Sequence, residues 1–516
     1  MIPKRAIREF LDRPRDDWSW YKELEDERLN RRRDNLPIDP PIWNKLKRHQ
    51  KQGFLLGIRL RKLAFWFSTG TGKTLMSLAL MRYFEEKRTL THTLVLVPNL
   101  SNKEEWGLEI EKHAPNIEYA ILGGRMEDRW KKLLTSTATV FIDTYAGFAR
   151  LMSMPGKAGK LVSNQQRIEA LSKLINFIVC DESSQGGLGN RASLTYRIVN
   201  KLSRAAKYVY LLNGTPFGRD PTPLWSQMHV VDQGETLGES LGLFRESLYD
   251  ETHNGWATEW VFNEKNTTTL HQILKHRSLR YQADEADLPP VVRISKYARL
   301  GGEAKAVYRK AFKSLQQAQG KVIALQNEFL RMRQISSGFL GYKDEEDGKA
   351  AQFEFKENPK LELLLGVLLS VVDEHKAVVY NEYTFSGSLI CRELKKLGIP
   401  HARIYGGTKD VGVQLRTFTR DPRCRVLVLN PQAGGLGLNL QCAKYVVYYE
   451  SPVSPRVRIQ SEARVARQGS THDKVYIYDL IAAPIDRAIL SMHVEGRSLL
   501  DAILDGKETN QLLLTD

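Results

Sequence analysis

The chain has 516 residues, of which 42% are hydrophobic, and a chain of this length divides into roughly three or four folding units. Its formal net charge of +16 favours a polyanionic partner such as nucleic acid, because clustered Lys and Arg release counterions from phosphate. The four cysteines form no C-x-x-C pair, and no apolar run approaches the ~20 residues of a membrane span, so zinc sites, disulfide frameworks and membrane insertion are not expected.

The first 40 residues are rich in alternating charge and are interpreted as a charged, solvated helical arm. From residue 41 to residue 222, short apolar runs alternate with amphipathic stretches. These runs read "LAFWFS", "TLVLVP", "TVFIDT", "NFIVCDE" and "YVYLLNGTP". Buried strands that alternate with helices predict a parallel sheet covered on both faces.

Between residues 223 and 350 strands are predicted to be scarce, and this segment is interpreted as a helical insert. Its longest amphipathic part, from "EAKAVYRKAF" to "LRMRQIS", is helical in period with Gly320 as a joint. Apolar runs return over residues 351–485 as "KAVVYNEY", "HARIYGG", "CRVLVLNP", "KYVVYYES" and "KVYIYDLIA". The prediction is an α/β protein with two similar parallel-sheet lobes, followed by a helix and tail over residues 486–516.

The first apolar run is followed by "STGTGKT", which predicts a phosphate-binding loop. Gly70 and Gly72 let backbone N–H groups face an anion at the positive end of a helix, Lys73 reaches the β and γ phosphates, and Thr74 ligates Mg²⁺. Phe67 stands where the strict pattern has its first glycine, and the alternative is a chance turn. The residues assigned to the nucleotide here are Thr69, Gly70, Thr71, Gly72, Lys73 and Thr74.

Two further elements would complete a hydrolytic site. The strand "NFIVCDESS" delivers Asp181 to hold Mg²⁺ and Glu182 to orient and deprotonate the attacking water, although such a pair alone is most often a solvated strand end. In "RIQSEARVARQGS", Arg464 and Arg467 are three residues apart and are expected on one face of a helix. They are candidate arginine fingers, and an ordinary basic helix is the alternative.

The order of these motifs resembles helicase superfamily two, and within it the Swi/Snf-type, chromatin-remodeller-like DNA translocase ATPases, from about residue 46 to residue 503. The resemblance implies two RecA-like lobes, with ATP bound by the first. "LKRHQKQGFLLG" resembles the glutamine motif, which implies that Gln50 contacts adenine. "AGGLGLNLQ" and "RIQSEARVARQG" resemble motifs V and VI, which implies that Gly437 and Asn439 lie near the nucleotide and that Arg464 and Arg467 act on its phosphates.

Other segments resemble motifs that contact DNA or couple it to ATP. "LVLVPNLSNKEEW" and "FIDTYAGFAR" resemble segments that touch the nucleic-acid backbone, which implicates Pro98, Asn99, Thr144 and Tyr145. "LLNGTPFGRDPTPLW" resembles motif III and implies a coupling role for Gly214, Thr215 and Pro216. "LRMRQISSG" resembles a block found in Swi/Snf-type proteins. The sequence "DESS" departs from D-E-A-H, so Ser183 and Ser184 replace residues that usually link ATP to motif III.

The resemblance implies a motor that uses ATP and Mg²⁺, binds duplex DNA or single strands, and moves along the backbone without sequence specificity as a monomer. One alternative is a strand-separating or annealing helicase acting on forked or branched DNA. Another is a DNA-binding scaffold for a partner nuclease or methylase. The expected location is the cytoplasm of a bacterial or phage-infected cell, or the nucleus if the source is eukaryotic, with no membrane partner.

Overall fold

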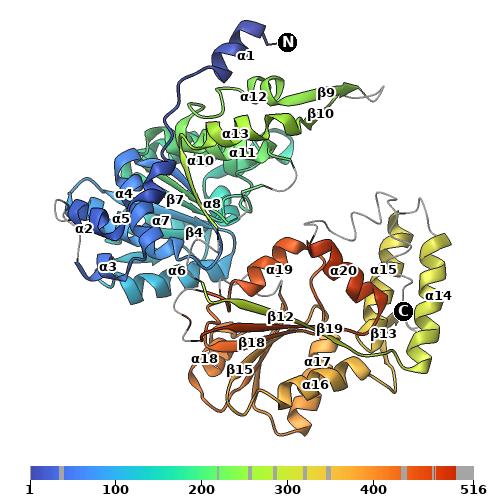
Figure 1. Ribbon diagram of the computed structural model, residues 1–516. Coiled ribbons are helices and arrows are strands. Elements are labelled where there is room, and N and C mark those ends of the chain that lie inside the picture. The colour runs from blue at the N-terminus through green and yellow to red at the C-terminus, as the bar shows by residue number, and fades with distance from the viewer. Residues whose placement is uncertain are drawn as a thin grey trace. The chain divides into compact units, whose positions relative to one another are not determined.

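The computed structural model divides the chain into two compact units, Met1–Asp287 and Leu288–Asp516 (Figure 1), and each is described by itself. Within the part of the chain that the structure describes, no helix combines the length and the apolar character needed to cross a bilayer. The described residues are 2–33, 36, 40–214, 216–217, 220–253, 258–282, 288–317, 322–343, 350–431, 438–467, 470 and 472–494.

The first unit contains a seven-stranded sheet in which every neighbouring pair of strands is parallel. All carboxyl ends of its strands therefore lie at one edge, where ligands bind in open α/β sheets. In their order across the sheet the strands are β11 (Ser278–Tyr281), β1 (Lys62–Phe67), β8 (Tyr208–Leu212), β7 (Ile175–Asp181), β2 (His92–Val97), β4 (Val140–Thr144) and β3 (Tyr119–Ile121).

Both faces of this sheet are buried, because successive side chains of each strand enter two different cores. In β1, Phe65 and Phe67 pack with helices α3 to α6, whereas Ala64 and Trp66 pack with α7 to α13. The helices are α3 (Pro40–Lys45), α4 (Arg48–Leu60), α5 (Lys73–Glu86), α6 (Leu100–His113), α7 (Met126–Thr135), α8 (Tyr145–Leu151), α9 (Gln165–Leu174), α10 (Leu194–Ala205), α11 (Thr222–Asp232), α12 (Leu241–Leu248) and α13 (Thr267–Leu274).

The N-terminal arm contains α1 (Lys4–Leu11), the 3₁₀ helix η1 (Ser19–Glu23) and α2 (Asp26–Arg33). Most of its charged side chains are exposed or half-buried, but four apolar ones join the two cores of the first unit. Phe10, Tyr21, Leu24 and Leu29 are each no more than 3% exposed. The arm is therefore solvated only on one side and packs with the other.

The second unit contains a six-stranded parallel sheet. Its strands, in order, are β12 (Val291–Tyr297), β19 (Val475–Ile481), β18 (Ala443–Tyr448), β15 (Lys376–Tyr380), β17 (Val426–Leu429) and β16 (His401–Ile404). Its helices are α14 (Gly302–Gln317), α15 (Val322–Ser336), α16 (Pro359–Leu369), α17 (Thr384–Lys396), α18 (Val411–Arg420), α19 (Pro455–Glu462) and α20 (Pro484–Val494). The pair α14 and α15 packs with α20 in a third core of this unit (Figure 1).

Three two-stranded antiparallel hairpins complete the described strands. Two belong to the first unit and one to the second. They are β5 (Ser153–Pro155) with β6 (Leu161–Ser163), β9 (Tyr249–His253) with β10 (Thr258–Phe262), and β13 (Phe339–Lys343) with β14 (Ala350–Glu354).

The predicted α/β class with two parallel sheets is confirmed, and all ten apolar runs named from the sequence form strands. The amphipathic stretch after residue 302 is helical as predicted, and Gly320 lies outside the described residues. The segment 223–350 supplies β11 to the first sheet and β12 to the second, and it is divided between the two units. The domain boundaries drawn from the sequence remain predictions.

Candidate nucleotide site and nucleic-acid interface

The loop between β1 and α5 has the backbone shape that a phosphate-binding role requires. Gly70 and Gly72 have φ angles of 82° and 75°, values that favour glycine because they cost it no Cβ clash. Thr71 is buried, and its Oγ1 donates to the carbonyl of Ser68 at 2.8 Å, which closes the loop on itself. Gly72 directly precedes the first residue of α5, so the loop ends at the positive pole of a 14-residue helix.

Lys73 lies at the first turn of α5 and is only 8% exposed. Its Nζ donates to the carbonyl oxygens of Phe67 at 2.9 Å and Ser68 at 3.3 Å. Both acceptors are neutral, whereas a phosphate oxygen would give a charge-assisted hydrogen bond. The ammonium group is therefore already held at the loop to which the sequence assigns the phosphates.

Two residues of α4 hold the loop from the other side. Nε2 of Gln50 donates to the carbonyls of Thr71 at 2.9 Å and Gly72 at 3.1 Å. Nε2 of His49 lies 2.9 Å from the same carbonyl of Thr71. Oε1 of Gln50 accepts the backbone N–H of Lys47 at 2.8 Å. Gln50 thus fixes the backbone of the phosphate loop, and its contact with adenine remains a prediction.

Two glycines set the distance between α4 and α5. A Cβ on Gly53 would lie 2.6 Å from Sδ of Met76, and one on Gly57 would lie 3.0 Å from Cδ2 of Leu80. The glycines are four residues apart and so share one face of α4. Their lack of side chains lets α4 approach α5 closely enough for Gln50 to reach the loop.

Asp181, the last residue of β7, is held by groups from three elements. Its Oδ2 accepts a hydrogen bond from Nε1 of Trp106 in α6 at 2.9 Å, and its Oδ1 accepts the backbone N–H of Glu182 at 3.0 Å. Its carbonyl accepts the hydroxyl of Tyr145 at 2.8 Å. Glu182 has a φ of 47°, which is uncommon for a residue with a side chain and typical of functional turns. The sequence reasoning missed Trp106.

Ser183 keeps a connection that the sequence put in doubt. It is fully buried, its Oγ donates to Oε1 of Gln227 at 2.7 Å, and Nδ2 of Asn213 donates to it at 3.2 Å. Nε2 of Gln227 in turn donates to the carbonyl of Pro216 at 2.7 Å. A serine at this position therefore still links the end of β7 to the segment after β8, and Gln227 is a second residue that sequence reasoning missed.

The structure brings that segment against the phosphate loop. A Cβ added to Gly214 would lie 3.2 Å from the backbone nitrogen of Thr69. The strands β1, β8 and β7 are neighbours and parallel, so the loop, Gly214 and Asp181 follow from the same edge. Thr215 lies outside the described residues.

The four predicted nucleic-acid contacts lie at the ends of β2 and β4 or directly after them. Pro98 is half-buried, and Oδ1 of Asn99 accepts the N–H of Asn102 at 3.2 Å within the first turn of α6. Oγ1 of Thr144 accepts the N–H of Gly147 at 3.0 Å and caps α8. Tyr145 is only 2% exposed, and burial raises the pKa of its hydroxyl well above the usual value. Asn99 and Thr144 thus have structural hydrogen bonds and Tyr145 is buried, and the contact of all four residues with DNA remains a prediction.

A buried ion cluster lies directly before Thr144. Asp143 pairs with Nζ of Lys103 at 3.1 Å and with the guanidinium group of Arg129. Burial raises the pKa of Asp143, although both cations act in the opposite direction. The cluster ties α6 and α7 to β4, so the two predicted DNA-contacting segments are fixed relative to each other.

In the second unit, the expectation that Arg464 and Arg467 share a helical face is wrong, because α19 ends at Glu462. The carbonyl of Arg464 accepts the N–H of Leu440 at 2.9 Å, a partner outside the helix. Nη1 of Arg464 is buried and has no hydrogen-bond partner among the described residues. A guanidinium nitrogen of this kind suits an anion.

The predicted residues of motif V are only partly described. Gly437 lies outside the described residues. Asn439 is half-buried, and its Oδ1 accepts the N–H of Gln441 at 3.3 Å. Leu440 lies between Asn439 and Gln441, and its backbone N–H bonds to the carbonyl of Arg464. The segments that resemble motifs V and VI are therefore joined through the backbone.

Arg458 anchors α19 on the sheet. Its guanidinium group lies 3.5 Å from the ring centroid of Tyr448 and contacts both oxygens of Asp479 at 2.6 and 3.0 Å. Its Nε bonds to Glu462 at 2.6 Å, and Glu462 also accepts both Nη groups of Arg293 from β12. These pairs fix α19 to β18, β19 and β12, and so determine where the chain that carries Arg464 begins.

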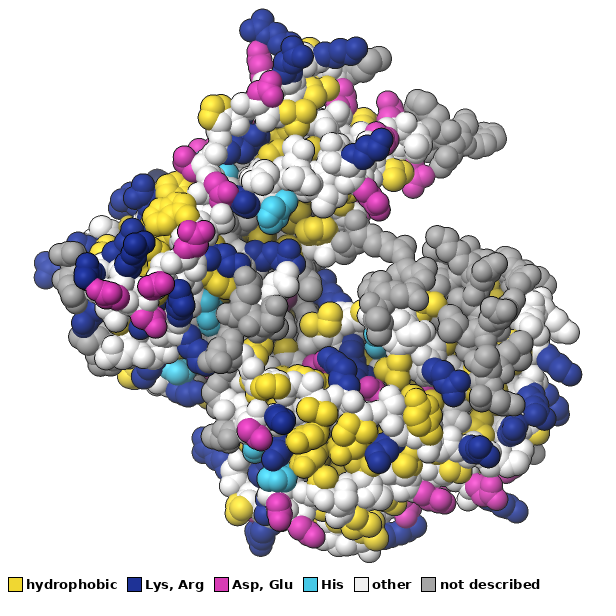
Figure 2. Space-filling view, viewed as in Figure 1, with side chains coloured by type: hydrophobic (Ala, Val, Ile, Leu, Met, Phe, Trp, Pro, Cys, Tyr) yellow, Lys and Arg dark blue, Asp and Glu magenta, His cyan; other side chains and the backbone are white. Residues whose placement is uncertain are grey.

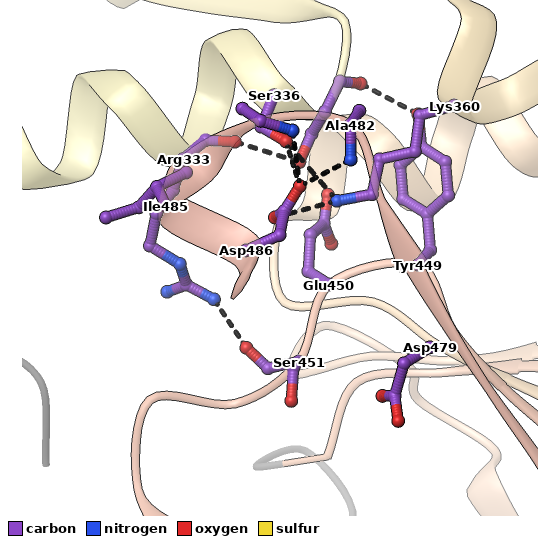
Figure 3. Close-up of polar contacts among 12 residues, drawn as sticks. Arg333, Ser336, Lys360, Tyr449, Glu450, Ser451, Asp479, Ala482, Ile485 and Asp486 are labelled. Atoms are coloured by element: carbon purple, nitrogen blue, oxygen red, sulfur yellow. Dashed lines mark hydrogen bonds and ion pairs between the residues drawn. The ribbon is translucent and has the colours of Figure 1, made fainter. Parts of the chain in front are cut away.

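A second polar network joins α15, α16 and α20 (Figure 3). Asp486 accepts hydrogen bonds from Nζ of the buried Lys360 at 2.9 Å and from Oγ of Ser336 at 2.5 Å. Arg333 donates to the carbonyl of Ser451 at 2.8 Å. Arg333 and Ser336 belong to "LRMRQISSG", the segment that resembles a Swi/Snf-type block. That segment therefore connects the helical pair to the end of β18.

Comparison with known families decides the wider class. Residues 67–349 match the SNF2-related domain, and residues 359–469 match the Helicase conserved C-terminal domain. The chain belongs to the SNF2-related family. Membership of helicase superfamily two, Swi/Snf type, was predicted from the motifs and is confirmed.

Relatives of this SNF2-related chain come from eukaryotes and bacteria. It is 24% identical over 479 residues to Nuclear protein STH1/NPS1 of Saccharomyces cerevisiae, covering 85% of this chain and 33% of the relative. It is 23% identical over 492 residues to the Putative ATP-dependent helicase/translocase YwqA of Bacillus subtilis, covering 91% of this chain and 50% of the relative. The chain thus spans between a third and a half of the length of these two relatives.

Among solved structures, the Sulfolobus solfataricus SWI2/SNF2 ATPase core in complex with dsDNA is similar to this SNF2-related chain. The sequence identity is 21%, the TM-score is 0.42, and the match covers 93% of this chain and 96% of the other.

Proposed function

We propose that the chain is a DNA-dependent ATPase of the Swi/Snf type that moves along duplex DNA without sequence specificity. The observation that carries this proposal is the convergence of three strand ends at one sheet edge in a member of the SNF2-related family. One end carries the Lys73 loop, the next leads to Gly214, and the third ends in Asp181 and Glu182. The name of the Bacillus subtilis relative, a putative helicase/translocase, also supports it.

In this proposal the loop amides and Lys73 bind the phosphates of ATP. Thr74 and Asp181 would hold Mg²⁺, which when bound neutralises charge that develops on the phosphates. The oxygen chemistry of this pair fits the ion. Glu182 orients the attacking water and takes its proton. Gln50, Gly437 and Asn439 contact the nucleotide, and Arg464 with Arg467 stabilises the charge on the γ-phosphate.

Coupling between ATP and DNA runs through Ser183. Its hydrogen bonds to Asn213 and Gln227 connect the carboxylate strand to the Gly214 segment, which abuts the phosphate loop. A shift of Asp181 or Glu182 during hydrolysis would then move the segment that contains Gly214, Thr215 and Pro216. The proposed contacts to the DNA backbone lie at or directly after the ends of β2 and β4 and are Pro98, Asn99, Thr144 and Tyr145.

The net charge of +16 supports binding through phosphates. Phosphate contacts carry no sequence information and weaken steeply with salt. The exposed Lys157 and Lys160, in the turn between β5 and β6, are suited to such contacts. Binding should therefore be similar for unrelated duplex sequences and fall as salt rises.

The test is ATP turnover measured without nucleic acid and with single-stranded DNA, duplex, forked DNA and RNA. Duplex DNA should raise turnover, and Lys73→Ala and Glu182→Gln should each abolish it while duplex binding persists. An ATP turnover rate that is the same with and without DNA would overturn the proposal. Strand displacement on the fork would favour the helicase alternative, and DNA binding by the unaltered chain without turnover would favour the scaffold.

A further inference from the structure

The N-terminal arm is built onto the helix that carries Gln50. Nε2 of Gln52 in α4 donates to the carbonyls of Lys22 at 2.9 Å and Leu24 at 2.8 Å. Nε of Arg48 donates to the same carbonyl of Leu24 at 3.3 Å. Leu29 of α2 is fully buried in the core that also contains α4. The segment from η1 to α2 is therefore a fixed part of the first unit, beside α4 (Figure 1).

A cavity of about 400 Å³ lies between η1 and α2. Its volume is within the range of small-molecule sites. The lining combines one large aromatic ring, one aliphatic side chain, three cationic groups and one carboxylate. The lining residues are Trp20, Glu23, Leu24, Arg28, Arg31 and Arg32.

The three arginines of the lining lie on one face of α2, because their spacing is three and four residues. Arg31 pairs with Glu27, one turn earlier. Arg28 and Arg32 have no carboxylate partner within the described ranges. The lining therefore holds more positive charge than its own carboxylate, Glu23, offsets.

The aromatic part of the lining is accessible. Trp20 is 39% exposed, although large aromatic side chains are usually well buried. The guanidinium carbon of Arg32 lies 5.5 Å from the centroid of its ring, within the range of a cation–π contact. An indole face and a guanidinium plane side by side are the two surfaces on which nucleic-acid bases stack.

We propose that this cavity binds a nucleotide unit, with the base stacked against Trp20 and Arg32 and the phosphate on Arg28 and Arg31. Glu23 is placed to accept a hydrogen bond from an exocyclic amino group. A bare anion would use the arginines but gain nothing from the indole, and an apolar ligand would leave the arginines unused. The nucleotide comes either from a DNA strand or from free nucleotide in solution, and the DNA source rests on the proposed function.

The experiment compares Arg28→Ala/Arg32→Ala and Trp20→Leu with a matched control, Lys4→Ala/Arg8→Ala. The control also removes two exposed positive charges from the arm, but from α1, which does not line the cavity. One assay measures the anisotropy of fluorescein-labelled single-stranded and duplex oligonucleotides without ATP. The other measures binding of a fluorescent ATP analogue without DNA. Thermal unfolding checks that each variant is folded.

Both cavity variants should weaken binding about tenfold in one of the two assays, the usual scale of a lost base stack. The control should change binding in either assay less than twofold. Weaker oligonucleotide binding identifies a DNA strand as the source of the nucleotide, and weaker binding of the ATP analogue identifies free nucleotide. Equal effects in cavity and control variants would overturn the proposal. Loss with the arginine variant but not with Trp20→Leu would also overturn it, because only phosphate would then be recognised. Duplex-stimulated turnover of the unaltered chain reports on the proposed function separately.

Discussion

The candidate nucleotide edge of the first unit and the interior of the second unit both hold charged side chains, and the contacts that can be named for them differ in kind. At the edge, Lys73 donates to two backbone carbonyls, and Asp181 accepts from an indole N–H and a backbone N–H. In the second unit, Arg458 and Lys360 pair with the carboxylates of Asp479 and Asp486. A hydrogen bond to a neutral group can be exchanged for a contact with a phosphate or a metal ion at little cost, whereas breaking a buried ion pair leaves a charge uncompensated. The hydrogen bonds named at the edge are therefore compatible with ligand binding, and the ion pairs of the second unit suit a scaffold.

Arg464 differs from Arg458 and Lys360, because its buried Nη1 has no hydrogen-bond partner in the described part of the chain. Arg458, six positions earlier, forms ion pairs with Asp479 and Glu462. The contrast is consistent with the proposal that Arg464 acts on a ligand, whereas Arg458 holds a helix in place. A substitution of Arg464 should therefore lower ATP turnover more than stability, and a substitution of a paired scaffold residue should lower stability more than turnover.

The largest expected effect is that of Arg464→Ala on ATP turnover. An arginine that stabilises the transferring phosphoryl group contributes about a thousandfold or more to the rate. Turnover with saturating duplex should fall by about that factor, while the thermal unfolding midpoint stays close to that of the parent. The control is Arg420→Ala, an exposed arginine at the end of α18. A stability loss without a rate loss would make Arg464 part of the scaffold.

The next effect tests the scaffold itself. Lys360→Met removes the ammonium group from Asp486 and should lower the free energy of unfolding by about 3–5 kcal/mol, the usual cost of an unpaired buried charge. Denaturant unfolding measures the loss. Lys360→Met/Asp486→Asn removes the stranded charge and should recover part of it. A loss well below 1 kcal/mol from the single change would mean that water reaches Asp486.

The burial of each strand explains which parts of the fold could be predicted from the sequence. Most of the ten predicted strands are largely buried and are nearly continuous apolar runs, whereas β16 (HARI) and β19 (VYIYDLI) alternate buried and half-buried residues. β12 was missed because it is a sheet edge whose residues are mostly exposed, and its sequence "VVRISKY" alternates with polar residues. β3 has only three residues, and β11 is an edge strand of four.

The candidate site could be proposed from the sequence where its residues are close together. The proposed phosphate loop and the Asp181–Glu182 pair each occupy a few consecutive positions, so their spacing forms a local pattern. Trp106 meets Asp181 across 75 positions, and Gln227 meets Ser183 across 44, and neither contact leaves a local pattern. The helix expected to carry Arg464 ends at Glu462, and the carbonyl of Arg464 accepts from Leu440, 24 positions earlier, a contact that leaves no local pattern.

A smaller effect concerns the neutral network at the nucleotide edge. Ser183→Ala leaves Nδ2 of Asn213 and Oε1 of Gln227 buried with one partner fewer, which costs about 1–3 kcal/mol locally. Because this network links the carboxylate strand to the Gly214 segment, the fold stimulation of turnover by duplex should fall about tenfold. Turnover without DNA should change less than threefold.

The matched control for that change is Ser172→Ala, whose Oγ bonds only within α9 to the carbonyl of Ile168. It should leave both basal and duplex-stimulated turnover unaltered. If Ser183→Ala lowered the two rates equally, the network would serve catalysis alone and the coupling role would be excluded.

The smallest expected effect is a change in pH dependence at Glu450, a buried carboxylate in the second unit's scaffold. Its Oε2 accepts the N–H of Glu382 at 2.7 Å and Oγ of Ser386 at 3.0 Å, while its Oε1 is buried with no hydrogen-bond partner among the described residues. Burial raises the pKa of Glu450 above its ordinary value of 4.5, although Lys360 acts in the opposite direction. The folded state therefore binds this proton more tightly than the unfolded state.

The sign of the effect follows from that difference. From pH 4.5 up to the raised pKa, the unfolded chain ionises Glu450 while the folded chain keeps it neutral, so this group lowers stability as pH rises. Glu450→Gln cannot ionise, and its stability relative to the parent should increase with pH over that window. Thermal unfolding at a series of pH values measures the difference, with the exposed Glu357→Gln as the control. Parallel curves for Glu450→Gln and the parent would show that Glu450 is compensated by Lys360, and the scaffold would then pair all its charges.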